Sequence, residues 1–286
     1  MGNVYPTALV VDRLAEQAIT VLGNKLAPLR AFSRDFGTDP LRPRAKVQVQ
    51  STATTSTAAA NPSDYESGDS TSTAVEVTVE ELNASFHVGS QDLMQGQRLE
   101  TIAAANLHSL GDLIWDKCVA NFNASSAGSN TRIIVAEESF AAANREAAWA
   151  SIAKGSEKHL ILDGTAYSQN LPTDRNSFDL SQNGAFGFDG IHLATKWDAT
   201  GAESNLYGVA AAPNGLAVAA GLPEISGPVA SNLEEVGTVE VPDLGLTVQT
   251  CLWGSTKTRA TWASYGVMFG AAKGDVTAFT CIISSS

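Results

Sequence analysis

The sequence has few residues of the kinds that build disulfide frameworks and metal sites. Its three cysteines are an odd number without close spacing, which indicates neither a disulfide scaffold nor a zinc site. We expect small core or sheet residues at Cys118, Cys251 and Cys281. The four histidines are also far apart in sequence, at His87, His108, His159 and His192. No group of His, Cys and carboxylate residues has the spacing of metal ligands, so the sequence predicts no metal and no cofactor.

Long apolar runs are missing as well. A membrane-spanning helix needs about 20 consecutive apolar residues, and the most apolar window, residues 206–222, is broken by Pro213, Asn214 and Gly215. The first residues contain no basic side chain before Arg13, so they do not resemble a secretory signal. We expect a chain that is made in the cytoplasm and has no membrane partner.

Positive charge is scarce and unevenly placed. Lys and Arg number 18 against 30 Asp and Glu, a formal net charge of −12, which argues against a primary nucleic-acid binder because phosphate neutralisation needs clustered cations. Seven of the 18 basic residues lie within residues 1–46, whereas residues 47–97 have none and carry seven acids. This arrangement favours pairing between copies of the chain, with two solvated faces of opposite charge as the plainer alternative.

The motifs of common enzymes are not found. The sequence has no G-x-x-x-x-G-K-[ST], G-x-S-x-G or H-E-x-x-H pattern, and the glycines of GAFGFDG lack dinucleotide-binding spacing. Two adjacent carboxylate pairs, at Glu80 and Glu81 and at Glu137 and Glu138, point apart in a strand or helix, so we interpret them as surface charge. We expect no enzymatic activity.

The sequence does contain a polar stretch between two strand-like segments. Within residues 51–73, 12 of 23 residues are Ser or Thr. On either side, KVQVQ (46–50) and AVEVTVE (74–80) alternate valine with polar residues, which is the period of half-buried strands. The pattern predicts two strands that pair with each other around a long polar tip; a flexible linker between domains is the alternative.

The rest of the chain divides into helical and β segments. Apolar residues spaced three and four apart predict one long amphipathic helix over residues 93–122. Residues 1–45 combine one short helix with Pro28, Pro40 and Pro43, which favour an extended arm. Strand and helix patterns alternate in the middle, and the C-terminal part shows strands separated by Gly-containing turns. The fold class is therefore α+β.

Four stretches are informative in the order in which they occur: LAPLRAFSRDFG followed by KVQVQ, AVEVTVEELNASFHVGSQDLMQG, NGLAVAAGLP, and LGLTVQTCLWGSTKTRATWASYGVMFGAAKGD. Together they resemble segments of the major capsid proteins of tailed double-stranded DNA bacteriophages, whose Hong Kong 97-type fold encapsulins and the herpesvirus capsid floor share. The first two are similar to the junction of N-terminal arm and extended loop and to the return strand before the spine helix. The third is similar to a short helix after a buried strand, and the fourth to the C-terminal strands.

The resemblance implies five parts: an N-terminal arm (1–45), an extended β-hairpin loop (46–90), a peripheral domain with the spine helix (91–135), an axial domain (136–233), and C-terminal strands shared between the two domains (234–286). It implies a structural protein whose hexamers and pentamers form an icosahedral shell around double-stranded DNA, without sequence-specific DNA binding. A separate scaffolding protein and a portal would be its other partners. The shell would be assembled in the host cytoplasm, and the chain would reside in the virion.

The resemblance also places the arm and the loop tip where neighbouring subunits meet. The candidate subunit-contact residues are Arg30, Arg34, Arg42 and Arg44 in the arm and Asp64, Tyr65, Glu66 and Asp69 in the loop. Two other functions stay open. One is an encapsulin-like bacterial compartment of the same fold, which would enclose enzymes in place of DNA. The other is a secreted modular binding protein with residues 51–73 as its linker.

Overall fold

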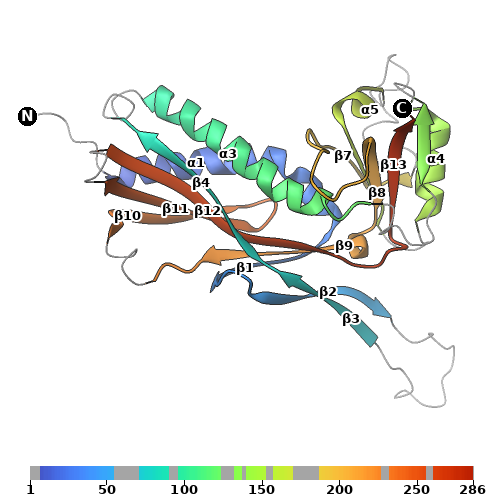
Figure 1. Ribbon diagram of the computed structural model, residues 1–286, viewed down its shortest axis with the longest axis horizontal. Helices are drawn as coiled ribbons and strands as arrows, with labels where there is room; N and C mark the ends of the chain where they lie inside the picture. Colours follow the sequence, from blue (N-terminus) through green and yellow to red (C-terminus); the bar gives the residue numbers. More distant parts are fainter. Residues whose placement is uncertain are drawn as a thin grey trace, which may run out of the picture.

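The protein is an elongated molecule of two bodies, with a two-stranded hairpin that leaves the underside of the larger one (Figure 1). The computed structural model describes residues 7–54, 71–89, 96–123, 132–136, 140–152, 157–169, 187–226, 232–255 and 260–285. No helix among these residues is long and apolar enough to cross a membrane.

The larger body is a six-stranded sheet covered on one face by two helices. Its strand order is β1-β9-β12-β11-β10, with β4 also paired to β12. The strands are β1 (Ser33–Leu41), β4 (Glu80–Val88), β9 (Leu216–Pro223), β10 (Glu235–Val241), β11 (Leu246–Ser255) and β12 (Ala260–Lys273). The helices α1 (Thr7–Lys25) and α3 (Gly96–Val119) lie side by side over this sheet (Figure 1). A short 3-10 helix, η1 (Ala27–Ala31), leads from α1 to β1.

Alternation along β12 places one set of side chains under the helices. Tyr265, Val267 and Phe269 belong to the same buried core as Leu14 of α1 and Leu107 of α3. The Tyr265 hydroxyl donates a hydrogen bond to the Leu14 carbonyl oxygen at 3.0 Å. A buried tyrosine hydroxyl needs such a partner, so this bond fixes α1 at one position on the sheet.

The smaller body is a five-stranded sheet with its own core. Its order is β5-β13-β8-β6-β7. The strands are β5 (Ile133–Ala136), β6 (His159–Leu162), β7 (Gly190–Leu193), β8 (Leu206–Ala211) and β13 (Phe279–Ser285). Its helices are α4 (Ala142–Ser151) and α5 (Gly164–Gln169). The chain passes from this body to the larger one through η3 (Pro213–Gly215), which joins β8 to β9.

The hairpin consists of β2 (Lys46–Thr54) and β3 (Thr71–Thr78), which pair with each other and with no other strand in the part of the chain that the structure describes. The strands are antiparallel, with Lys46 opposite Thr78 and Gln50 opposite Ala74. The predicted pairing of these two segments is therefore confirmed. The predicted long helix is confirmed too, since α3 lies within residues 93–122. The three cysteines are free, with Cys118 and Cys281 buried and Cys251 half-buried.

One expectation drawn from the sequence is wrong. The stretch NGLAVAAGLP was expected to contain a short helix, but Leu216–Pro223 is strand β9. Val218 and Ala220 face the core under the helices, and Ala217 and Ala219 face the hairpin. Because both faces are covered, the segment has no polar residues and hence no periodicity that distinguishes strand from helix. Pairing with β1 and β12 outweighs the helix propensity of alanine.

Candidate functional site

The root of the hairpin is seated on the sheet face opposite the helices. It forms a separate small core of Val49, Val77, Val79, Ala217, Ala219 and Met268. Gly270 of β12 lies directly beneath the link from β3 to β4, where an added Cβ would be 2.3 Å from the Thr78 carbonyl oxygen. The missing side chain at this position allows the hairpin backbone to cross close to β12.

A tight corner between β1 and β2 sets the direction of the hairpin. Arg44 has a φ of 67°, in the left-handed region, which costs about 1–2 kcal/mol for a residue with a Cβ. Its N–H donates to the Val79 carbonyl at 2.8 Å, and the Val79 N–H donates to the Ala45 carbonyl at 3.0 Å. The Ala45 N–H closes the turn on the Arg42 carbonyl at 2.9 Å. These bonds hold the strained corner in place and leave the Arg44 side chain exposed.

Arg42, at the same corner, is paired within the chain. Its Nε donates to Oε2 of Glu224 at 2.6 Å and its Nη2 to Oε1 at 3.3 Å, a two-pronged contact with the segment after β9. The hydrogen bond from Arg42 lowers the pKa of the Glu224 carboxyl, and the one to Glu224 raises the pKa of Arg42. Because both groups are solvated, this pair orients the corner more than it stabilises the fold.

Arg30 and Arg34 have partners in the turn between β10 and β11. Arg30 Nη2 lies 3.0 Å from Oδ2 of Asp243, and Arg34 Nη1 donates to the Leu244 carbonyl at 3.2 Å. Burial, and then the charge of Arg30, lower the pKa of Arg34. Three of the four candidate arginines thus bond to their own chain, a result that charge counting along the sequence did not predict. For the Arg44 side chain, no hydrogen bond or ion pair is seen among the described residues.

The structure brings the arginines together as two pairs, one at the corner and one at the β10–β11 turn. The loop candidates Asp64, Tyr65, Glu66 and Asp69 lie outside the described residues. Contact between the arm arginines and the loop acids stays a prediction.

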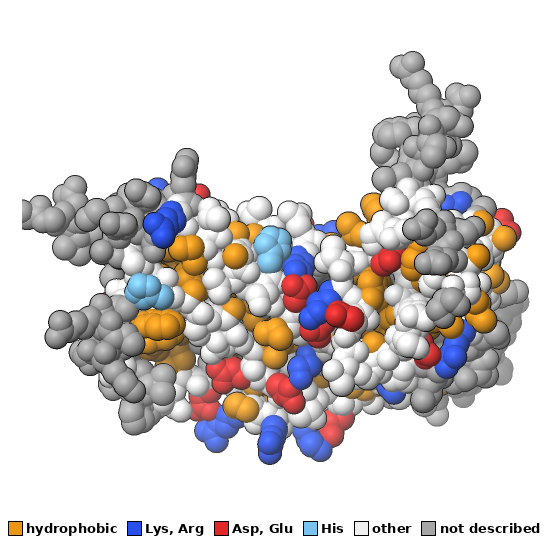
Figure 2. Space-filling model, turned by 45° about the horizontal axis from the view of Figure 1, so that its top comes forward, with side chains coloured by type: hydrophobic (Ala, Val, Ile, Leu, Met, Phe, Trp, Pro, Cys, Tyr) orange, Lys and Arg blue, Asp and Glu red, His pale blue; other side chains and the backbone are white. Residues whose placement is uncertain are grey.

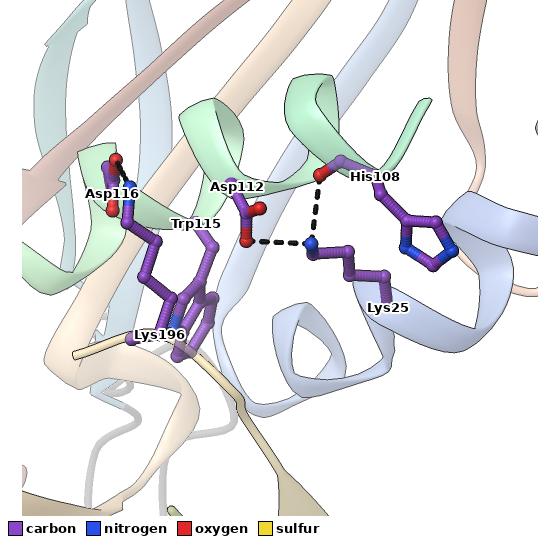
Figure 3. A network of polar contacts seen from close by, with 6 residues as sticks. All are labelled: Lys25, His108, Asp112, Trp115, Asp116 and Lys196. Atoms are coloured by element: carbon purple, nitrogen blue, oxygen red, sulfur yellow. Dashed lines mark hydrogen bonds and ion pairs between the residues drawn. The ribbon is translucent and has the colours of Figure 1, made fainter. Parts of the chain in front are cut away.

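Polar contacts join the two bodies along α3 (Figure 3). Lys196, which follows β7, places its Nζ 2.5 Å from Oδ2 of Asp116, and this hydrogen bond raises the pKa of Lys196. The Trp115 indole Nε1 donates to the Lys196 carbonyl at 2.8 Å. One turn earlier on α3, Asp112 Oδ1 lies 2.7 Å from Nζ of Lys25, the last residue of α1. The segment after β7 is therefore bonded to α3, one of the two helices that cover the sheet of the larger body.

Two histidines lie close together on the smaller sheet. His159 Nδ1 and His192 Nε2 are 3.3 Å apart, although 33 residues separate them in sequence. Burial, the charge of His159 and that of Arg30 lower the pKa of His192 to about 4, and burial also lowers the pKa of His159. Both imidazoles are thus neutral at pH 7. His192 lines a cavity of about 540 Å³, together with Lys25 of α1 and His108 of α3. Sequence reasoning missed this pair because only the register of β6 and β7 reveals it.

Charge on the surface is mixed. On the face in Figure 2, Lys and Arg side chains are interspersed with Asp and Glu near the middle of the molecule and do not form a separate positive area. Clustered cations of the kind that phosphate binding needs are not seen on this face.

The sheet body with its long helix, the smaller sheet body and the projecting hairpin together define the Hong Kong 97-type capsid fold. The sequence matches no protein-family model and no curated protein.

Several solved structures are similar to this chain. The virus-like particle from Pyrococcus furiosus is similar over 95% of this chain and 98% of its own, with a TM-score of 0.52 and 12% identity. A Mycobacterium phage Bobi structure covers 90% of both chains with a TM-score of 0.49 and 15% identity. The capsid of Cyanophage P-SCSP1u covers 90% of this chain and 87% of its own, with a TM-score of 0.44 and 12% identity. The predicted fold is confirmed by the first of these, and at such identities the likeness concerns the fold.

Proposed function

We propose that this chain is a major capsid protein, whose copies self-assemble into an icosahedral shell around the double-stranded DNA genome of a tailed bacteriophage. The fold it has in common with the subunit of a virus-like particle supports the proposal. The observation that carries it is the hairpin.

A lone subunit leaves this hairpin only half supported. Its root is buried against β9 and β12 through Val49 and Val77, but beyond Gln50 and Ala74 the described residues of the two strands pair with each other alone. An isolated two-stranded ribbon is marginally stable in water. The outer hairpin therefore needs another surface, and a neighbouring copy supplies one in a closed symmetric assembly.

The remaining parts of the proposal concern partners. Subunits form hexamers and pentamers, and a separate scaffolding protein and a portal complete the shell. DNA is enclosed by proximity, which the net charge of −12 and the mixed surface support. The role is mechanical and not enzymatic. Assembly takes place in the host cytoplasm, and the mature chain resides in the virion.

Sedimentation and negative-stain microscopy of the expressed chain test the proposal. We expect shells, or hexamers and pentamers, and not a 29.8 kDa monomer. A compact monomer under every condition, with the cognate scaffold included, contradicts it. Packaged enzyme in place of DNA indicates an encapsulin-like compartment, and two halves that fold separately on either side of residues 51–73 indicate a modular binding protein.

Within this proposal, the arginines of the arm meet the acids Asp64, Glu66 and Asp69, with Tyr65, on a neighbour's loop. Arg44 gives the sharpest test because its side chain is exposed and the other three arginines already bond to their own chain. Replacing Arg44 by Glu should reduce assembly, most strongly at low salt, because exposed charge pairs are screened by salt. Light scattering at low and high salt measures the effect, and thermal unfolding checks that the subunit stays folded.

The matched control is Arg44→Asn, which removes the charge but tolerates the left-handed backbone. We expect it to assemble less well than the parent at low salt and equally well at high salt. If Arg44→Asn and Arg44→Glu lose assembly equally at both salt concentrations, Arg44 acts through packing or by holding the backbone of the β1–β2 corner. The proposed electrostatic contact with a neighbouring copy is then wrong.

A further inference from the structure

We propose that His159 and His192 bind a late divalent transition-metal ion, Zn²⁺ or Cu²⁺, with water in the remaining coordination positions. The two residues lie on neighbouring parallel strands, with His159 opposite Gly190 and Ile161 opposite His192. Residues two apart on a strand share a face, and so do residues in register. The two imidazoles are therefore diagonal neighbours on one face of the sheet.

The separation of the two ring nitrogens fits a bridging ion. His159 Nδ1 and His192 Nε2 are 3.3 Å apart. Two nitrogens at about 2.0–2.1 Å from a tetrahedral zinc ion lie about 3.3–3.4 Å from each other. An N–H donor usually lies about 2.7–3.2 Å from its acceptor. A direct hydrogen bond between the rings is long at this distance, whereas 3.3 Å is the separation expected of two nitrogen ligands of one zinc ion.

Space beside the two nitrogens is kept open by a glycine. A Cβ added at Gly190 would lie 2.8 Å from His192 Nε2 and 2.9 Å from His159 Nδ1. Any other residue at this position would therefore press on both nitrogens. His192 also faces the cavity of about 540 Å³ between the bodies, which Tyr167 and Thr195 line as well. This cavity gives an ion and its waters access to His192.

The other nitrogen of His159 matches the second shell of a metal site. His159 Nε2 is buried and has no hydrogen-bond partner among the described residues. The Glu157 carboxylate oxygen Oε2 lies 4.0 Å from it. A metal on Nδ1 leaves the proton on Nε2, the nitrogen 4.0 Å from this carboxylate, and a carboxylate behind a ligating histidine is the usual arrangement in metal sites.

The ligand type decides the kind of ion. Neutral imidazoles suit zinc, copper and nickel, whereas calcium and magnesium need oxygen ligands. No group of three or more His, Cys, Asp or Glu side chains in the described part of the chain could hold a metal. The protein thus supplies two ligands, and affinity is moderate and favours Cu²⁺ over Zn²⁺. Bound there, the ion would fasten the four-residue edge strand β7 to β6.

The test uses the full chain, first stripped with a chelator. Added Zn²⁺ should raise its Tm in proportion to the logarithm of the zinc concentration, and chelator should reverse the rise. His192→Gln should abolish this shift. The matched control His87→Gln, at an exposed histidine that does not line the cavity, should keep it. An unresponsive parent chain, or an equal response from His192→Gln, overturns the proposal, as does loss of the shift in His87→Gln alone.

A second measurement needs no substitution. The electron paramagnetic resonance spectrum of one equivalent of Cu²⁺ on the parent chain should show coupling to two imidazole nitrogens. Coupling to one nitrogen or to none overturns the site, even if a variant fails to fold.

Discussion

A chain in which Asn-Gly replaces residues 51–73 will fold and will form no shells. Gln50 and Ala74 are directly opposite each other in the β2–β3 ladder, so a two-residue turn can join them without disturbing the strands below. The buried root with Val49 and Val77 stays in place, and the Tm of the subunit should change little. Under the proposed function, assembly should fail because residues 51–73 are the segment proposed to contact a neighbouring copy. Circular dichroism and negative-stain microscopy give the two readouts.

A Gly/Ser segment of the same length as residues 51–73 is the control for this deletion. It restores the length of the segment without its side chains, so partial assembly assigns the remaining effect to Tyr65 and the acids around it in the sequence. Efficient shell formation by the shortened chain would show that the hairpin is not an assembly element.

Replacing Gly270 by Ala should destabilise the subunit by about 1–3 kcal/mol, the usual cost of overpacking a buried site. The new Cβ would lie 2.3 Å from the Thr78 carbonyl oxygen, and backbone cannot move aside as a flexible side chain can. The hairpin root must lift away from β12. Denaturant unfolding measures the loss in the free energy of unfolding. Amide exchange that becomes faster than in the parent chain in β2 and β3, but not in α3, shows that the loss arises at the hairpin root.

Gly164→Ala is the matched control, because nothing lies within 4 Å of a Cβ at that position. Its effect should stay within about 0.5 kcal/mol, as for most surface substitutions. An equal cost at positions 164 and 270, or amide exchange unchanged in the hairpin, would mean that the close crossing at Gly270 does not hold the hairpin root.

The hairpin and the long helix were predictable because each has one face in a polar environment. Alternating valines in KVQVQ and AVEVTVE mark the half-buried strands, and the three- and four-residue spacing marks α3. β9 was not predictable in this way. Its alanines and Val218 are buried on both sides, so the sequence pattern contains no contrast between faces.

Contacts between residues that are distant in the sequence could not be predicted either. The partner of Arg42, Glu224, lies 182 positions away, and nothing local to either residue predicts their pairing. His159 and His192 become neighbours only through the register of β6 with β7. The left-handed backbone of Arg44 is likewise imposed by its hydrogen bond to Val79, because arginine has no local preference for it.

The position of β12 and β13 in the chain has a consequence for synthesis. β12 pairs with β4, β9 and β11 in the larger sheet, and β13 pairs with β5 and β8 in the smaller one. Both strands follow all the strands with which they pair, so a nascent chain exposes α1 and α3 well before the surfaces on which they pack exist. Neither core closes until residues 260–285 have left the ribosome. A product that ends before β12 has no complete sheet in either body and stays open to the cell's proteases.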